Sequence, residues 1–120
     1  MPASTEPRSG LKFGWNLGES GWNADMNNNL LRLGRFGFHF SIKDRDLATP
    51  PASPAAGDTF LIAASPTGAW AGRAAGDAAV WTGSAWDYAT PRQGWFVYIE
   101  DEQKLSVFKT GTGWSAGIAI

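Results

Sequence analysis

The sequence predicts a mainly β protein: a small antiparallel β domain, sandwich-like or barrel-like, that follows a Gly- and Trp-rich arm and one short α-helix. Three observations lead to this prediction. The 120 residues contain 15 glycines and 7 prolines, which suits short strands joined by tight turns. They also contain 7 tryptophans and 7 phenylalanines but no cysteine, so large rings rather than disulfides are expected to stabilise the fold. Finally, short apolar runs bounded by turn residues recur along the second half of the chain.

The Gly- and Trp-rich arm precedes a single predicted helix. Glycines recur between Phe13 and Trp22, which excludes a helix interior there. Asn23 is a suitable N-cap, and Gly34 stands where a helix C-terminus favours glycine. The apolar residues between them share one stripe of the helix: Met26, Leu30 and Leu33. A helix of about ten residues is unstable alone in water, so the stripe is expected to pack on its own domain or on a neighbouring chain.

The sequence pattern of residues 36–58 predicts a strand followed by a connector. Phe36–Lys43 alternates between apolar and small or polar residues, which is typical of a strand. Asp44–Asp58 contains three prolines and is expected to be an extended, polyproline-like connector. Its PxxP pattern favours a spacer over an SH3 ligand, because no Lys or Arg closely flanks it. The predicted domains are therefore residues 1–35, an arm and helix for attachment or trimerisation, and residues 36–120, the β domain with its Pro-rich connector at 44–58.

Six further strands are predicted in the rest of the chain, each next to turn residues. They span Thr59–Ala63, Ala78–Trp81, Ala85–Ala89, Gly94–Glu100, Leu105–Lys109 and Trp114–Ile120. In Gly94–Glu100 both faces are apolar, which indicates that this strand is central in its sheet or is covered by another chain.

A Thr-Gly turn followed by a tryptophan occurs three times. The tryptophans are Trp70, Trp86 and Trp114, and the turn glycines are Gly68, Gly83 and Gly111. We expect each glycine to adopt a positive φ and each tryptophan to be more than half buried against a neighbouring strand or subunit. An alternative use of the same three indoles is a flat platform for a sugar. Burial of all three would remove that platform, whereas exposure of two or more on one face would favour it.

Residues able to perform chemistry are few. His39 is the only histidine, so the usual histidine-rich metal site is not expected. Ser41 lies on the same predicted strand face but lacks the strained elbow of a nucleophilic serine. Glu100, Asp101 and Glu102 form an acidic run that predicts a solvated hairpin turn; the alternative is a small glycoside hydrolase that uses Glu100 or Asp101. The sequence therefore predicts a protein that is not an enzyme and that uses no cofactor or metal.

Charge and hydropathy argue against two classes of partner. Lysine and arginine total 10 against 11 aspartate and glutamate, so the net charge is −1. This balance argues against binding to nucleic acid or to a charged membrane surface. No apolar run approaches the roughly 20 residues of a membrane span, and the polar N-terminus has no apolar stretch typical of a secretory signal.

Two segments resemble known families. The run from Phe13 to Asn23, followed by Met26 to Leu30 and Leu33, resembles the opening of many tailed-phage fibre and tail proteins, in which a Gly- and Trp-rich turn leads into a short helix. The Pro-rich connector and four short motifs after it resemble a domain of unknown function that recurs in structural proteins of phages and gene transfer agents. The motifs are Thr67–Gly72, Ala79–Trp81, Pro91–Trp95 and Glu100–Glu102. The resemblance implies a virion part, such as a fibre, a spike or its attachment base, and implies no catalytic residue.

Together these observations predict a non-enzymatic virion structural protein, a fibre, spike or attachment module on the head or tail, assembled in the cytoplasm of a bacterial host. Its expected partners are further copies of itself, as a homotrimer, and other virion proteins such as capsid, portal, tail or fibre components. The residues expected to make these contacts lie in the arm and helix: Trp15, Trp22, Met26, Leu30 and Leu33. The alternative is a module that binds a host-surface glycan through Trp70, Trp86 or Trp114.

Overall fold

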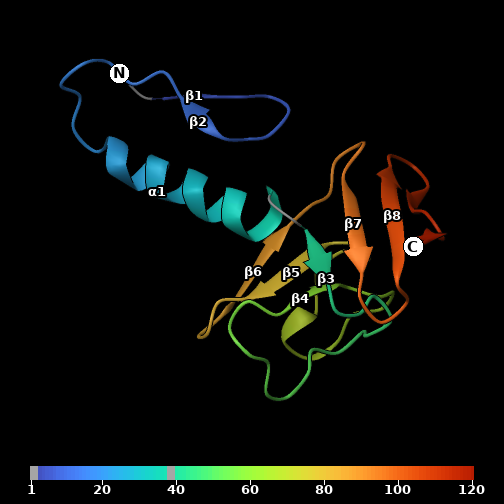
Figure 1. The fold of residues 1–120 in the computed structure, drawn as a ribbon. Helices are drawn as coiled ribbons and strands as arrows, with labels where there is room; N and C mark the ends of the chain where they lie inside the picture. Colours follow the sequence, from blue (N-terminus) through green and yellow to red (C-terminus); the bar gives the residue numbers. More distant parts are fainter. Residues whose placement is uncertain (1–2, 38–39) are drawn as a thin grey trace. The chain divides into compact units, whose positions relative to one another are not determined.

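The computed structural model describes residues 3–37 and 40–120. The chain forms two compact units, Met1–Phe38 and His39–Ile120, which Figure 1 traces in sequence colours. The first, the N-terminal unit, holds two short strands and a helix; the second, the β unit, holds the other strands. The predicted fold class, mainly β with one short α-helix, is confirmed for the described residues.

The N-terminal unit begins with a hairpin and continues into helix α1. Strands β1 (Ser4–Thr5) and β2 (Lys12–Phe13) pair antiparallel, and helix α1 spans Trp22–Arg32. The Asn29 side chain joins the helix to β2. Its Oδ1 accepts a hydrogen bond from the Lys12 N–H and its Nδ2 donates to the Lys12 carbonyl, both at 2.8 Å. This reciprocal pair satisfies both backbone polar groups of Lys12 and fixes β2 against the helix.

Both predicted ends of the helix are wrong. The N-cap is Gly21 rather than Asn23, because the arm enters the helix through a left-handed residue with φ +82°, which glycine adopts without steric cost. At the other end Gly34 does not stop the helix, which continues as a π-helical turn, η1 (Leu33–Gly37). The Leu33 N–H donates to the carbonyls of both Asn29 and Leu30, so the helical ladder is unbroken where the turn begins.

The strand predicted at Phe36–Lys43 is wrong in its first part. The first two of these residues belong to η1, residues 38–39 lie outside the described residues, and strand β3 is limited to Ser41–Ile42. The alternating pattern predicted a strand, but Phe36 also lies four residues after Arg32, which is the spacing of neighbours on a helix. The Arg32 guanidinium carbon is 4.9 Å from the Phe36 ring centroid, a contact at helical spacing that stabilises the extra turn.

The larger sheet of the β unit has the strand order β10-β8-β7-β3, and β9 pairs with β8. Besides β3, its strands are β7 (Phe96–Ile99), β8 (Lys104–Lys109), β9 (Gly113–Trp114) and β10 (Ile118–Ala119). Strands β3 and β7 run parallel, whereas β7 and β10 are both antiparallel to β8; β7 and β8 lie side by side in Figure 1 (orange and red). Strand β7 is therefore central in its sheet, one of the two possibilities that its apolar faces predicted.

The smaller sheet has the order β4-β5-β6 and is antiparallel throughout. Its strands are β4 (Thr59–Leu61), β5 (Ala78–Trp81) and β6 (Trp86–Ala89), with a short 3₁₀ turn, η2 (Gly68–Trp70), between β4 and β5. A parallel bridge between Asp44 and Phe60, and a 2.8 Å hydrogen bond from the Lys43 N–H to the Thr59 carbonyl, link the chain after β3 to β4. The two sheets are thus joined through the backbone.

Most predicted strands of the β unit are present with small shifts at their ends. Strand β5 has the predicted bounds, Ala78–Trp81. The last predicted strand, Trp114–Ile120, is wrong as one element, because the chain forms two short strands there. Gly117 lies between them with φ +99°, a backbone conformation that interrupts a strand.

The core of the β unit has two parts, and the connector packs against one of them. The first part is a cluster of Phe60, Ile62, Trp70 and Ala79. The second includes Ile42, Val97 and Ile99 on one face of the larger sheet. The connector at 44–58 has no regular secondary structure, and its first part packs against the β unit. Leu47 packs against the first cluster, and its carbonyl accepts a 3.0 Å hydrogen bond from the Ala63 N–H.

Candidate functional site

The stripe of α1 is the first candidate site, and it lies in a unit with almost no core. In the described part of the N-terminal unit, residues 3–37, Phe36 is the one buried hydrophobic side chain, and α1 itself has no buried residue. The side chain of Trp22 is 49% exposed and that of Leu30 is 59% exposed. Met26, Leu33 and Trp15 are half-buried. Of the predicted stripe, Leu30 is therefore the residue whose apolar area is mainly accessible to a partner, with Trp22 exposed at the start of the helix.

The three tryptophans after Thr-Gly turns make structural contacts. Trp70 is completely buried, and its ring centroid lies 5.9 Å from that of Phe60 and 5.2 Å from that of Trp86. Trp114 stacks edge-on against Phe108 at 5.4 Å. Trp86 and Trp114 are partly buried, so the prediction that all three indoles are more than half buried is confirmed.

The turns that precede these tryptophans also follow the prediction. The predicted glycines Gly68, Gly83 and Gly111 have φ values of +64°, +105° and +89°, which L residues with a side chain rarely adopt. The Trp114 Nε1 donates a 2.8 Å hydrogen bond to the Gly76 carbonyl, 38 residues away in sequence. Each turn thus directs an indole into a packing or hydrogen-bonding role, and Trp70 leaves no surface for a sugar to stack on.

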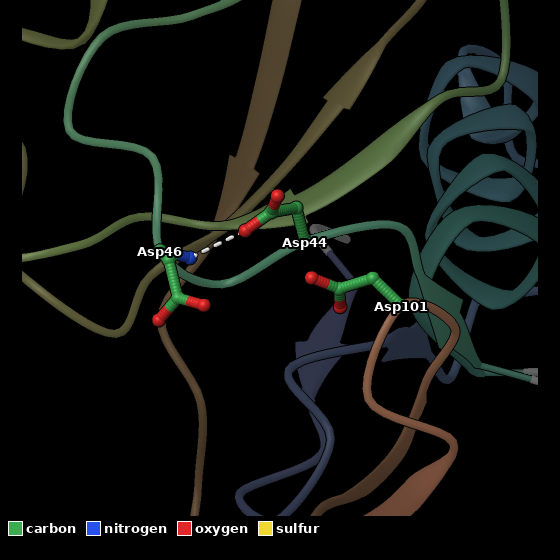
Figure 2. A group of neighbouring side chains, drawn as sticks. All are labelled: Asp44, Asp46 and Asp101. Atoms are coloured by element: carbon green, nitrogen blue, oxygen red, sulfur yellow. Dashed lines mark hydrogen bonds between the residues drawn. The ribbon is translucent and has the colours of Figure 1, made fainter.

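A group of three carboxylates forms where the connector meets the β7–β8 turn. Asp44 and Asp46 come from the connector and Asp101 from the turn, and one carboxylate oxygen of each lies within 4.8 Å of the others. Figure 2 shows the three side chains near one another, with the Asp46 N–H donating to Asp44 Oδ1 at 2.6 Å. Desolvation, followed by repulsion from Asp44 and Glu102, raises the pKa of Asp101. The arrangement could hold a hard cation, but exposed acidic groups of this kind are common without one.

Arg45 clamps the same turn from the other side. Its Nε and Nη2 donate to the two oxygens of the Glu102 carboxylate at 2.8 and 2.9 Å. Its Nη1 and Nη2 also donate to the Ser115 and Ala116 carbonyls, both at 2.8 Å. The side-chain hydrogen bonds from Arg45 lower the pKa of Glu102. One guanidinium therefore ties the connector to the β7–β8 turn and to the segment before β10.

The remaining candidates for chemistry do not assemble into a catalytic set among the described residues. His39 lies outside the described residues. The Ser41 hydroxyl donates a 2.7 Å hydrogen bond to Glu100 Oε2, so its described partner is a carboxylate. Glycoside hydrolysis needs two carboxyl groups held apart across a substrate. Glu100, Asp101 and Glu102 form an exposed to half-buried turn, as predicted, and the hydrolase alternative stays an untested prediction.

The sequence did not predict which residues, distant in the same chain, contact the acidic turn at 100–102. It identified the acidic run at 100–102 but not its neighbours Asp44, Arg45 and Asp46, which lie more than 50 residues earlier. One signal was available in the sequence. Arg45 is a basic residue between Asp44 and Asp46, and a basic residue of this kind can pair with an acidic turn elsewhere in the chain. For the Asn29–Lys12 clamp we find no signal in the sequence.

The fold and these surfaces define a class: a small, mainly β protein with packed tryptophans, preceded by an arm and one short helix with exposed apolar residues. Over residues 26–115 the sequence matches a family model described as a protein of unknown function, DUF2793. The chain belongs to this family. A comparison with curated proteins gave no significant match. No helix in the described ranges is both long and apolar enough to cross a bilayer.

Proposed function

We propose that this chain is a non-enzymatic structural protein of a bacteriophage or gene-transfer-agent virion, acting as a fibre, a spike or an attachment module on the head or tail. One observation carries the proposal: α1 has no buried residue, and its apolar side chains Trp22 and Leu30 are 49% and 59% exposed. A segment of this kind suits a docking end, because it gains stability from the surface that it contacts. The resemblance of the arm and helix to the opening of phage fibre and tail proteins supports the virion setting.

In this proposal the two units divide the work. The N-terminal unit docks, with Trp15 and Trp22 as aromatic anchors in a pocket of another virion protein, such as a capsid, portal, tail or fibre component. Large aromatic side chains dominate the energetics of such contacts. The β unit, with its own buried core, is the stable body that the arm attaches to the particle.

The same stripe supports self-association into a homotrimer. Met26, Leu30 and Leu33 are spaced by four and three residues, the spacing of the seam of a helical bundle. Leu30 is more than half exposed, so packing three copies of α1 together would bury area that the single chain leaves in water. The contribution would be about 25 cal/mol for each Å² of apolar surface buried.

The Trp22→Ala variant tests the docking role. We expect it to lose incorporation into particles while the β unit keeps its fold, because Trp22 is half exposed and contributes little to a core. Truncating an interface anchor of this type typically costs about 2 kcal/mol or more of binding. Leu17→Ala, at an exposed apolar residue of the arm outside the stripe, is the matched control. Normal incorporation of Trp22→Ala would place the docking end elsewhere.

Binding of a host-surface glycan is the alternative proposal. It would have to use the exposed parts of Trp86 and Trp114, since Trp70 is fully buried. A glycan array probed with the full chain separates the two functions. Specific binding that is lost in Trp114→Ala, while the variant stays folded, would favour the glycan module over the purely structural role.

A further inference from the structure

The larger sheet has one buried face and an opposite apolar face that is partly exposed to solvent, with Tyr98 and Leu105 partly buried on it. Alternation along β7 and β8 places Val97, Ile99 and Ser106 on the buried face, where all three are inaccessible. The opposite face carries two cross-strand rows, Phe96 beside Val107, and Tyr98 beside Leu105 and Ile118. Phe96 is 64% exposed and Ile118 is 72% exposed. We call these five residues the outer face: Phe96, Tyr98, Leu105, Val107 and Ile118.

Charges of opposite sign lie at the two ends of the outer face. Lys109 is exposed and follows Val107 by two residues on β8, so it extends the Phe96 end. Glu100 is exposed and follows Tyr98 by two residues, so it extends the other end. There the neighbouring Lys43 is neutralised by an ion pair with Asp58 at 3.1 Å. Ser41 pairs with Tyr98 in register, and its hydroxyl donates to Glu100 Oε2, which keeps the carboxylate on this side of the sheet. At about 3.4 Å per residue, the two ends are roughly 20 Å apart.

We propose that the outer face binds the same face of a second copy of this chain, with the strands of the two copies antiparallel. In that orientation the Lys109 end of each copy meets the Glu100 end of the other, and uncharged apolar rows meet in between. A parallel orientation would bring like charges together, which is unfavourable. The separation of the two charges exceeds the Debye length of about 8 Å at physiological salt, so each acts on its neighbour across the interface rather than on its counterpart in the same sheet.

The size of the outer face determines how strong this contact is. A patch three strands wide and two rows long is smaller than the roughly 800 Å² per partner of a standard interface, so a single pair of faces binds weakly. In the homotrimer proposed above, on which this step rests, three such contacts act together and gain strength from effective concentration. We therefore expect the full chain to form paired trimers.

A charge swap tests the antiparallel contact. Lys109→Glu and Glu100→Lys should each shift the assembly, measured by light scattering at low salt, from paired trimers toward single trimers. The double variant, which exchanges the two charges, should restore pairing. Unchanged pairing in both single variants, or no restoration in the double variant, would overturn the proposal. Circular dichroism of every variant confirms that the β unit is folded.

Single cysteines give an orientation test that does not depend on stoichiometry, because the native chain has none. Glu100→Cys and Lys109→Cys proteins are mixed and treated with a short bis-maleimide. We expect cross-linked dimers in the mixture and few in either variant alone. Equal yields in all three samples would overturn the antiparallel arrangement.

A variant of α1 separates this contact from the proposed trimer. Leu30→Asp with Leu33→Asp should abolish trimers yet keep the mixed cross-link at high protein concentration. If the trimer is absent in the wild-type chain but the mixed cross-link forms, the proposed trimer fails and the outer-face contact stands. If trimers form without the mixed cross-link, the outer-face contact fails alone.

Discussion

The two units of this chain are stabilised in different ways. The β unit buries a tryptophan, several aliphatic side chains and a serine, and it uses one arginine to tie three of its segments together. In the N-terminal unit, over residues 3–37, Asn29 hydrogen-bonds the hairpin to the helix and Phe36 is the buried hydrophobic residue. The comparison teaches that composition alone does not determine a core. Both units are rich in Gly and aromatic residues, but among the described residues only the β unit buries an indole completely.

The largest expected effect tests this difference with one substitution in each unit. Trp70→Ala removes a fully buried indole and should lower the free energy of unfolding of the β unit by about 3–5 kcal/mol. Trp22→Ala removes a half-exposed indole and should change the stability of the β unit by less than about 0.5 kcal/mol. Urea unfolding followed by circular dichroism measures both. Similar losses in the two variants would contradict the division into units.

The next effect concerns the arginine clamp. Arg45→Gln removes the bidentate pair with Glu102 and the bonds to the Ser115 and Ala116 carbonyls. Hydrogen bonds to charged groups are worth about 1.5–3 kcal/mol each, and we expect a total loss of about 2–3 kcal/mol because the site is partly solvated. Arg45→Lys should recover little, since an ammonium group cannot bind both carboxylate oxygens in the same fork. A thermal melt that matches the wild type in Arg45→Gln would show that the connector is held by its apolar contacts alone.

The pH dependence of stability tests the Arg45–Glu102 pair in a second way. The pKa of Glu102 is lowered in the folded chain, so its contribution to stability is present above the ordinary glutamate pKa of about 4.3. That contribution is lost as the pH falls through the lower, folded value. We expect the midpoint of urea unfolding to fall below about pH 4.3 in the wild type and to fall less in Glu102→Gln. If the urea midpoints of the wild type and Glu102→Gln fall equally with pH, the pairing of Glu102 with Arg45 does not contribute to stability.

The smallest expected effect is an increase in melting temperature when Asp101 loses its charge. The pKa of Asp101 is raised in the folded chain, first by desolvation and then by Asp44. A carboxyl group with a raised folded pKa favours the folded state at low pH, and this contribution is lost as the pH rises through the folded value. Asp101→Asn should therefore raise the melting temperature at pH 7 by about 1–2 °C, with the gain shrinking at high salt because exposed charges are screened. A lower melting temperature at every salt concentration would assign the carboxylate a stabilising role.

Much of the β unit was predictable from sequence, because its strands alternate and its turns contain glycine. Strand β5 and the positive φ of Gly68, Gly83 and Gly111 follow from local rules. The parallel pairing of β3 with β7, and the contacts of Arg45 with the turn, were not predictable, since they join residues more than 50 positions apart. In the N-terminal unit the presence of one short helix was predicted correctly. The helix ends were not, because Gly21 and Gly34 each fit more than one role and a helical contact of Phe36 competed with its strand pattern.

The central claim is that the apolar residues of α1 need a partner to be buried, whereas the β unit folds around its own core without one. Light scattering of the full chain and of Leu30→Asp with Leu33→Asp, at micromolar concentration in physiological buffer, tests it most directly. We predict the mass of a trimer, or of paired trimers, for the wild type, and a smaller assembly with an intact β unit for the variant. A wild-type protein that is monomeric under these conditions would contradict the account.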